Sequence, residues 1–293
     1  MCVFDIQFLE NFMRRKILVF AWITATALIL SACQYQLSGE NDISSSVLLK
    51  QGTRGSPISE LSVVMPIAAG KTEAWRTALV DLLGAKYSEY DASRRRWGVV
   101  SQTTFLQKTP MGDFALIHLT GPDVRKSLHA MSESQNPWDI SWRELTHDLH
   151  GVDFAKGTQV FPKVERLFSM EHGDITDTQP FMFVAPLTQK GAVELRALAN
   201  DLMGSRNAEY VAARARLGVQ RESVFLESTP AGDAAVFYWL ASDPKASIKK
   251  FMGSTAPFDL WLRTQAQKSH PIALEMLKNT VMENILVADY PRK

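Results

Sequence analysis

The chain has 293 residues, of which 46% are hydrophobic and 22% are charged, and its formal net charge is +1. This composition is typical of a globular protein, and the length suffices for two domains of about 100 residues each. The chain is nearly neutral and has no long run of one charge sign, so it offers no electrostatic case for binding nucleic acid or an anionic membrane.

The amino terminus has the pattern of a secretory leader. A basic cluster, Arg14-Arg15-Lys16, precedes an apolar run over residues 17–30, which is too short for a stable bilayer-spanning helix. The string Leu30-Ser31-Ala32-Cys33 follows directly and resembles the bacterial lipobox, in which the cysteine is lipidated and begins the mature chain. We therefore expect a lipoprotein signal peptide over residues 1–32; an ordinary secretory signal with an incidental cysteine is the alternative. Translation could start at Met1 or at Met13.

The segment after Cys33 is expected to be a flexible tether over residues 33–60, because it is rich in Ser, Gly, Asn and Gln. Cys2 lies upstream of the signal, so the mature chain would have no pair of thiols for a disulfide. Lipidated Cys33 would anchor the protein in the cell envelope. In a Gram-negative bacterium, Gln34 after the cysteine resembles lipoproteins on the periplasmic face of the outer membrane.

The rest of the chain is an internal duplication. Residues 81–113 read DLLGAKYSEYDASRRRWGVVSQTTFLQKTPMGD and residues 201–233 read DLMGSRNAEYVAARARLGVQRESVFLESTPAGD, with 16 of 33 positions identical at an offset of 120. A repeat this long indicates two copies of one structural unit. We expect the first repeat over residues 61–172 and the second over residues 180–293.

Each copy shows the same order of expected elements. A short apolar strand ending in proline, residues 61–67 or 181–187, precedes a helical stripe with apolar residues spaced by three and four. A second helix is expected to end at Gly98 or Gly218, since glycine is the usual residue after a helix.

After that glycine the apolar residues alternate with period two, which predicts β-hairpins around the Thr-Pro-Met-Gly-Asp and Thr-Pro-Ala-Gly-Asp turns. Two helices and a closing strand, near residues 164–170 or 284–289, complete each copy. The order is β-α-β-β-α-β, an α+β fold class with two tandem ferredoxin-like repeats.

With its tandem copies, the chain resembles the dimeric α+β barrel superfamily, which includes antibiotic-biosynthesis monooxygenase-like and haem-degrading monooxygenase-like domains. The Glu-Tyr, Ser-Arg-Arg-Arg, Gly-Val and Phe-Leu-Gln-Lys-Thr-Pro-Met-Gly-Asp strings also resemble small bacterial domains. This resemblance implies a single-chain pseudo-dimeric barrel, but it brings no catalytic residue or cofactor with it. A cut after Gly173 that left two stable, separate halves would contradict the pseudo-dimer.

One expected helix of each copy carries a glutamate, a tyrosine and two arginines. The tyrosine lies one turn from the first arginine, and the glutamate lies two turns from the second on a shared face. Their guanidinium groups could anchor a ligand carboxylate; the alternative is an internal network, with Asp113 or Asp233 as a partner of an arginine. The candidates are Glu89, Tyr90, Arg94, Arg96, Glu209, Tyr210, Arg214 and Arg216.

Histidines are the second group of candidates. His150 and His270 are equivalent residues near the end of the last expected helix, where a side chain could ligate haem iron or act as a base. The alternative is a histidine that bonds helix carbonyls. No cluster has the spacing of zinc ligands, so the sequence predicts no metal site.

The third strand of each copy has one face that is apolar throughout and one that ends in His118 or Tyr238. We expect the first face to meet helices and the second to face the barrel interior, as a pocket or as a barrel filled by side chains.

Common catalytic and phosphate-binding motifs are absent from the sequence. Two function classes remain. The first is an envelope lipoprotein that binds a small apolar ligand or a protein partner without catalysis. The second is a cofactor-free monooxygenase-like or haem-handling enzyme of the dimeric α+β barrel kind.

Overall fold

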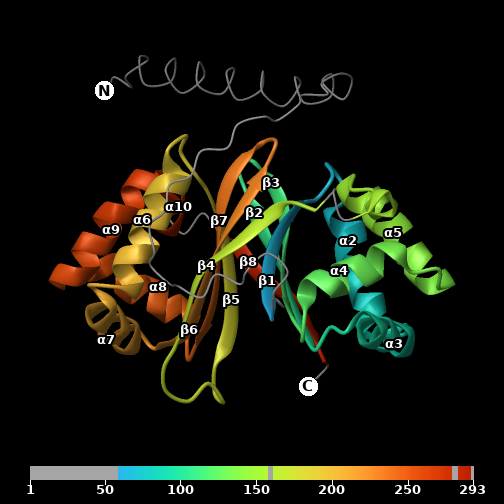
Figure 1. The fold of residues 1–293 in the computed structure, drawn as a ribbon, viewed down its shortest axis with the longest axis horizontal. Helices are drawn as coiled ribbons and strands as arrows, with labels where there is room; N and C mark the ends of the chain where they lie inside the picture. The colour runs from blue at the N-terminus through green and yellow to red at the C-terminus, as the bar shows by residue number, and fades with distance from the viewer. Residues whose placement is uncertain (1–58, 158–160, 279–282, 292–293) are drawn as a thin grey trace, which may run out of the picture. The chain divides into compact units, whose positions relative to one another are not determined.

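The computed structural model describes residues 59–157, 161–278 and 283–291 (Figure 1). The expected signal peptide, the lipidated Cys33 and nearly all of the tether lie outside the described residues. Within the described part of the chain, no helix is both long enough and apolar enough to cross a bilayer.

The elements follow the order predicted from the repeats. The first copy consists of β1 (Glu60–Pro66), α2 (Thr72–Leu83), α3 (Tyr87–Trp97), β2 (Ser101–Thr109), β3 (Gly112–Thr120), α4 (Val124–Glu133), α5 (Pro137–His150), the 3-10 helix η1 (Phe154–Lys156) and β4 (Lys163–Glu171). The second consists of β5 (Gln179–Pro186), α6 (Gly191–Met203), α7 (Asn207–Leu217), β6 (Val219–Thr229), β7 (Gly232–Ala241), α8 (Pro244–Gly253), α9 (Pro257–Ser269), α10 (Pro271–Lys278) and β8 (Glu283–Tyr290). The predicted α+β class with a duplicated β-α-β-β-α-β unit is confirmed. Helix α10 lies where the first copy has only the short 3-10 helix η1, and it was not predicted.

Local sequence explains where the helices begin and end. Gly98 and Gly218 both adopt left-handed backbone with φ of 76°, which ends α3 and α7 as predicted, because glycine has no Cβ to clash there. Asp123 accepts a hydrogen bond from the backbone N–H of Lys126, and Asp243 does the same for Ala246, so α4 and α8 begin at capped residues.

The closing strands are exchanged between the two copies. One sheet has the order β1-β3-β2-β8 and the other β4-β6-β7-β5, with antiparallel pairing throughout. Strand β4 of the first copy therefore completes the sheet of the second, and β8 of the second completes the sheet of the first. The sequence predicted both strands but not their exchange.

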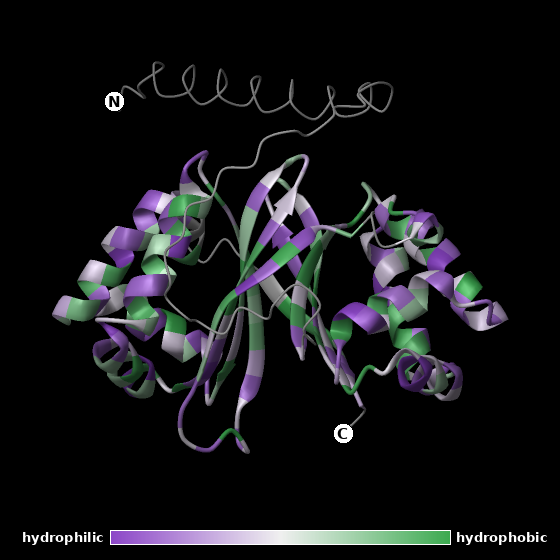
Figure 2. Ribbon diagram, in the orientation of Figure 1, coloured by the Kyte–Doolittle hydropathy of each residue, from purple (hydrophilic) through white to green (hydrophobic). Residues whose placement is uncertain are grey.

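The two sheets lie between two helical layers, with α2 to α5 against one sheet and α6 to α10 against the other (Figure 1). The helices carry both polar and apolar residues, as expected of helices that each cover one face of a sheet (Figure 2). The face between the sheets is packed with side chains from both copies, among them Phe105, Leu116, Met182, Phe225 and Val236. The barrel interior is thus filled, which is one of the two arrangements expected for it.

Side chains from the opposite sheet bind the free edges of β1 and β5. The Glu227 carboxylate accepts a hydrogen bond from the backbone N–H of Val64 at 2.8 Å. At the equivalent place, the Gln107 amide accepts from the N–H of Val184 at 2.9 Å and donates to its carbonyl at 3.3 Å. These bonds satisfy backbone groups that an edge strand leaves unpaired.

Candidate functional site

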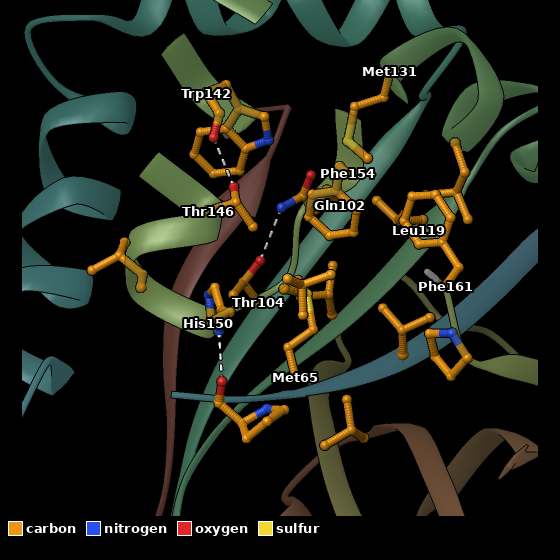
Figure 3. Close-up of a pocket in the computed structure, with 18 of the residues that line it drawn as sticks. Met65, Gln102, Thr104, Leu119, Met131, Trp142, Thr146, His150, Phe154 and Phe161 are labelled. Atoms are coloured by element: carbon orange, nitrogen blue, oxygen red, sulfur yellow. Dashed lines mark hydrogen bonds between the residues drawn. The ribbon is translucent and has the colours of Figure 1, made fainter. Parts of the chain in front are cut away.

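A cavity of about 700 Å³ lies between the sheet of the first copy and its covering helices. Its walls come from β1, β2 and β3 on the sheet side and from α2, α3, α4 and α5 on the helix side. The 3-10 helix η1, residues 161–163 and residues 227–230 of the second copy complete the lining. Figure 3 shows Met65, Leu119, Met131 and Phe154 among the apolar side chains around it. The volume is within the range of roughly 300–1,000 Å³ that small-molecule pockets occupy. The cavity is therefore separate from the filled barrel interior where the sequence led us to look.

The second copy has almost no space at the equivalent place, where a cavity of about 60 Å³ remains. The repeat alignment accounts for part of this difference. At four positions that line these cavities, the first copy has an apolar residue where the second has a larger aromatic one. The equivalent pairs are Val63 and Phe183, Ile117 and Phe237, Leu119 and Trp239, and Met131 and Phe251. Because protein interiors are close-packed, smaller side chains at four neighbouring positions leave a space. Three other pairs run the opposite way, with tryptophan in the first copy and leucine in the second: Trp75/Leu195, Trp97/Leu217 and Trp142/Leu262. The second copy is filled by its four aromatic residues together with Leu274 and Leu277 of α10.

Arg94 of α3 lines this cavity and has an exposed fraction of only 2%. Its guanidinium carbon lies 4.3 Å from the ring centroids of Tyr90 and Trp97 and 5.2 Å from that of Trp142. Each cation–π contact contributes about 0.5–2 kcal/mol, whereas burial of an ion costs several kcal/mol. The rings therefore offset only part of the desolvation cost of this charge.

The hydrogen bonding of Arg94 is incomplete. Among the described residues its Nε and Nη1 atoms have no hydrogen-bond partner, and no acidic side chain forms a salt bridge with it. The equivalent Arg214 also has an unpartnered Nη1, but its Nε donates to the Glu222 carboxylate, which accepts a further bond from the Tyr210 hydroxyl. Burial lowers the pKa of Arg214, but the neighbouring Glu222 outweighs this effect and raises it overall, so the guanidinium is charged. The buried arginine of the second copy thus has a carboxylate partner within the protein, and the buried arginine of the first copy does not.

The difference arises at one position of the repeat, where Gln102 stands in the first copy and Glu222 in the second. The Gln102 amide donates to the Thr104 hydroxyl at 3.1 Å, as Figure 3 shows. A neutral amide cannot compensate a guanidinium charge as a carboxylate does. The first copy therefore combines a large cavity with a buried arginine that lacks a counter-ion.

Neighbouring residues fix the ring that lies on Arg94. Asp139 is fully buried and accepts hydrogen bonds from Trp97 Nε1 at 3.3 Å and from Arg96 at 2.7 Å. Burial raises the pKa of Asp139, but its bonds to Arg96 and to Ser134 outweigh this effect and lower it overall. Asp139 therefore remains a carboxylate and holds Trp97 in place.

The other charged candidates of these helices have structural contacts. Arg96 and Arg216 bind Asp139 and Asp259, which lie on α5 and α9, rather than glutamates of their own helix. Glu89 is exposed and accepts a bond from Ser88, while Glu209 pairs with Arg206. Asp113 accepts from Thr72 at 2.6 Å instead of contacting an arginine. Of the eight candidates on α3 and α7, Arg94 is the one charged side chain that faces the large cavity.

His150 lines the same cavity at the end of α5. Its Nδ1 lies 2.9 Å from the Pro66 carbonyl, which can only accept, so Nδ1 carries the proton and Nε2 the lone pair (Figure 3). Burial lowers the pKa of His150, and its bond to Pro66 only partly offsets this. The imidazole is therefore neutral near pH 7.

His270 has diverged from His150. It is buried beside Ser269, whose hydroxyl lies 2.7 Å from its Nδ1, and burial lowers its pKa to about 4. Pro271 then starts α10, and Leu274 and Leu277 of that helix border the small residual cavity. The two equivalent histidines thus have different surroundings.

His118 and Tyr238 meet inside the barrel, as the alternation of their strands predicted. Their rings stack with centroids 3.7 Å apart and an interplanar angle of 8°. His118 Nδ1 lies 2.9 Å from the Ser62 hydroxyl, and burial lowers the pKa of His118 to about 4. Glu60 lies nearby and binds Arg221, Arg166 and Ser223. This network joins the two copies.

Sequence reasoning missed several residues that define the cavity site. Gln102, Thr104, Asp139 and Trp142 were not singled out, because each looks like an ordinary core or surface residue when read alone. A position-by-position comparison of the two copies would have shown the exchange of glutamate for glutamine beside a retained arginine. No group of three or more His, Cys, Asp or Glu side chains that could hold a metal ion occurs in the described ranges.

Comparison with known proteins gives structural likeness alone. No protein family and no curated protein matches the chain. A candidate monooxygenase from Fusobacterium nucleatum subsp. nucleatum matches with 10% identity over 81% of this chain and 99% of that chain, at a TM-score of 0.41. An anthrone oxidase-like protein matches with 13% identity over 72% of this chain and 85% of that chain, at a TM-score of 0.41. A candidate monooxygenase from Lactobacillus acidophilus matches with 6% identity over 79% of this chain and 96% of that chain, at a TM-score of 0.39. Likeness at these scores carries no argument about activity, so the fold class rests on the strand pairing described above.

Proposed function

We propose that this chain is a binding protein whose first copy holds a small apolar or amphipathic ligand and whose second copy serves as a scaffold. The observation that carries this proposal is the cavity of about 700 Å³ in one copy beside about 60 Å³ in the other. A core that gains only stability from its residues would be packed in both copies, because cavities destabilise a fold. The bulky residues of the second copy show that the same scaffold can fill the space.

The proposed setting is the cell envelope. The leader and the string at residues 30–33 favour a lipid anchor at Cys33, and a tether would hold the binding domain near the membrane. In a Gram-negative cell the protein would lie on the periplasmic face of the outer membrane. Loss of membrane association in a Cys33→Ala variant, measured by fractionation, would support the anchor, and unchanged association would argue against it.

Binding can be tested with N-phenyl-1-naphthylamine, a neutral probe that fluoresces in apolar sites, added to the full chain in detergent-free buffer. The Ile117→Phe, Leu119→Trp double variant places the second copy's residues in the first and should abolish probe fluorescence. Val193→Phe adds similar bulk at a residue that is 69% exposed and should bind as the wild type does.

The converse variant, Phe237→Ile with Trp239→Leu, opens the second copy and should add a second probe site. If the filled double variant folds and still binds the probe with wild-type affinity, the proposal is wrong. An empty wild-type chain that binds no probe would instead favour a role in binding a protein partner.

A second candidate function is an enzyme that removes a proton from a bound ligand. The neutral His150, with its lone pair on Nε2 and its position on the cavity wall, favours this alternative. His150 would take the proton while the Arg94 guanidinium stabilises the resulting anion. Deuterium exchange into 2-tetralone, followed by NMR, tests it: His150→Gln should abolish catalysed exchange and leave probe binding intact. Exchange at equal rates in both proteins would exclude this role.

A further inference from the structure

The unpaired charge in the first copy indicates what kind of ligand the cavity takes. We infer that the ligand carries a carboxylate, which binds Arg94 in the place that Glu222 occupies beside Arg214. This inference rests on the proposed function, because it assigns the chemistry of the same cavity.

The internal repeat supplies a built-in reference for the occupied state. In the second copy a carboxylate oxygen of Glu222 accepts buried hydrogen bonds from the Nε of Arg214 and the hydroxyl of Tyr210. In the first copy the arginine and tyrosine are retained as Arg94 and Tyr90, while the carboxylate is replaced by the Gln102 amide. Loss of the internal carboxylate coincides with gain of the cavity. A carboxylate of the ligand would give Arg94 the charge pairing that Glu222 gives Arg214 in the second copy.

Most other polar side chains of the cavity have partners within the protein, and Lys163, a second cation of the lining, is exposed. Gln102 donates to Thr104, the Thr146 hydroxyl donates to the Trp142 carbonyl, and His150 bonds the Pro66 carbonyl. Glu227 also lines the cavity, but its carboxylate accepts from the Val64 N–H, and it forms no salt bridge with Arg94. Among the described cavity residues that carry charge, Arg94 is thus the buried cation left to bind an anion.

The position of Arg94 determines how the ligand enters. Arg94 is 2% exposed and its guanidinium is bounded by aromatic rings, so a carboxylate reaches it inside the cavity rather than at its rim. The apolar remainder of the ligand then lies against apolar side chains of the lining, among them Ile117, Leu119, Leu128 and Met131. A small, strongly hydrated dianion such as inorganic phosphate would gain nothing from these walls, so an amphipathic monocarboxylate fits best.

The test compares dodecanoate with 1-dodecanol, which share a chain length and differ in charge, by displacement of N-phenyl-1-naphthylamine from the full chain. In the wild type, dodecanoate should displace the probe at a concentration at least tenfold lower than 1-dodecanol. Gln102→Glu should remove this preference, because it supplies Arg94 with an internal carboxylate and reproduces the second copy's pair. Arg94→Met should remove it as well, and 1-dodecanol should displace the probe equally from all three proteins.

Two controls separate charge from folding. Arg95→Met removes the neighbouring arginine, whose side chain is exposed, and should keep the preference for dodecanoate. Glu222→Gln unpairs Arg214 in the filled copy and should also keep it. Equal displacement by the two ligands in the wild type overturns the carboxylate assignment while leaving the proposed binding function intact. Failure of the probe itself to bind contradicts the binding function.

Discussion

The carboxylate of Glu227 accepts a hydrogen bond from the backbone N–H of Val64 across the two sheets, at 2.8 Å. Its counterpart Gln107 bonds both the N–H and the carbonyl of Val184. An amide can donate and accept at once, whereas an ionised carboxylate can only accept. Burial raises the pKa of Glu227 to about 7, although its bond from Val64 lowers it in part. The protonated acid is therefore the better match to this site.

Glu227→Gln should stabilise the protein at pH 8 and have little effect near pH 4.5. The folded-state pKa lies above the usual 4.5, so the folded state binds more protons than the unfolded state between about pH 4.5 and 7. Stability contributed by this group is therefore lost as the pH rises through that window, on the order of 1–3 kcal/mol. Urea unfolding of the wild type and of Glu227→Gln at pH 5 and pH 8 measures this difference in the free energy of unfolding. Gln107→Glu should show the opposite change at pH 8, and equal pH dependence of wild type and Glu227→Gln would contradict this account.

The internal repeat, together with the glycines and prolines that end its helices and strands, allowed most of the fold to be predicted. Gly98 and Gly218 ended helices as expected, because left-handed backbone is a local requirement that sequence records directly. The exchange of β4 and β8 was not predictable in this way, since a strand has the same alternating pattern whichever sheet it joins. The cavity was missed for a related reason. Its volume depends on how the side chains of several elements pack together, so no single apolar residue such as Ile117 indicates it.

The stacked His118 predicts how the protein responds to acid. Burial lowers its pKa to about 4, so the folded state keeps it neutral while the unfolded state binds a proton below about pH 6.5. Stability is therefore lost as the pH falls from about 6.5 to 4, by roughly 2–3 kcal/mol from this residue. His118→Phe, which keeps a ring against Tyr238, should reduce the acid slope of unfolding free energy whatever its effect at pH 7. His129→Gln, at an exposed residue of α4, should leave the slope unchanged. An unaltered slope in His118→Phe would show that the proton binds elsewhere.

The two arginines predict opposite effects for reciprocal substitutions. Glu222→Gln leaves Arg214 buried without its counter-ion and should lower the free energy of unfolding by roughly 3–5 kcal/mol, since half of a buried ion pair is costly. Gln102→Glu supplies Arg94 with a carboxylate and should leave stability unchanged or raise it. Guanidinium unfolding of both variants at pH 7 gives the comparison. If the two substitutions destabilise equally, the surroundings of Arg94 already neutralise its charge.

The exchanged strands predict that the two halves of the chain cannot separate after a cut between them. A protease site inserted after Asp174, in the exposed turn between β4 and β5, would leave β4 on the first fragment and β8 on the second. Each fragment would then hold the edge strand of the other's sheet, with seven antiparallel residue pairs between β2 and β8 and eight between β4 and β6. We expect the cleaved protein to elute as one particle with the mass of the intact chain and to dissociate only in denaturant. Native mass spectrometry after cleavage checks this. Two folded fragments that do not associate would contradict both the strand exchange and the single-chain pseudo-dimer.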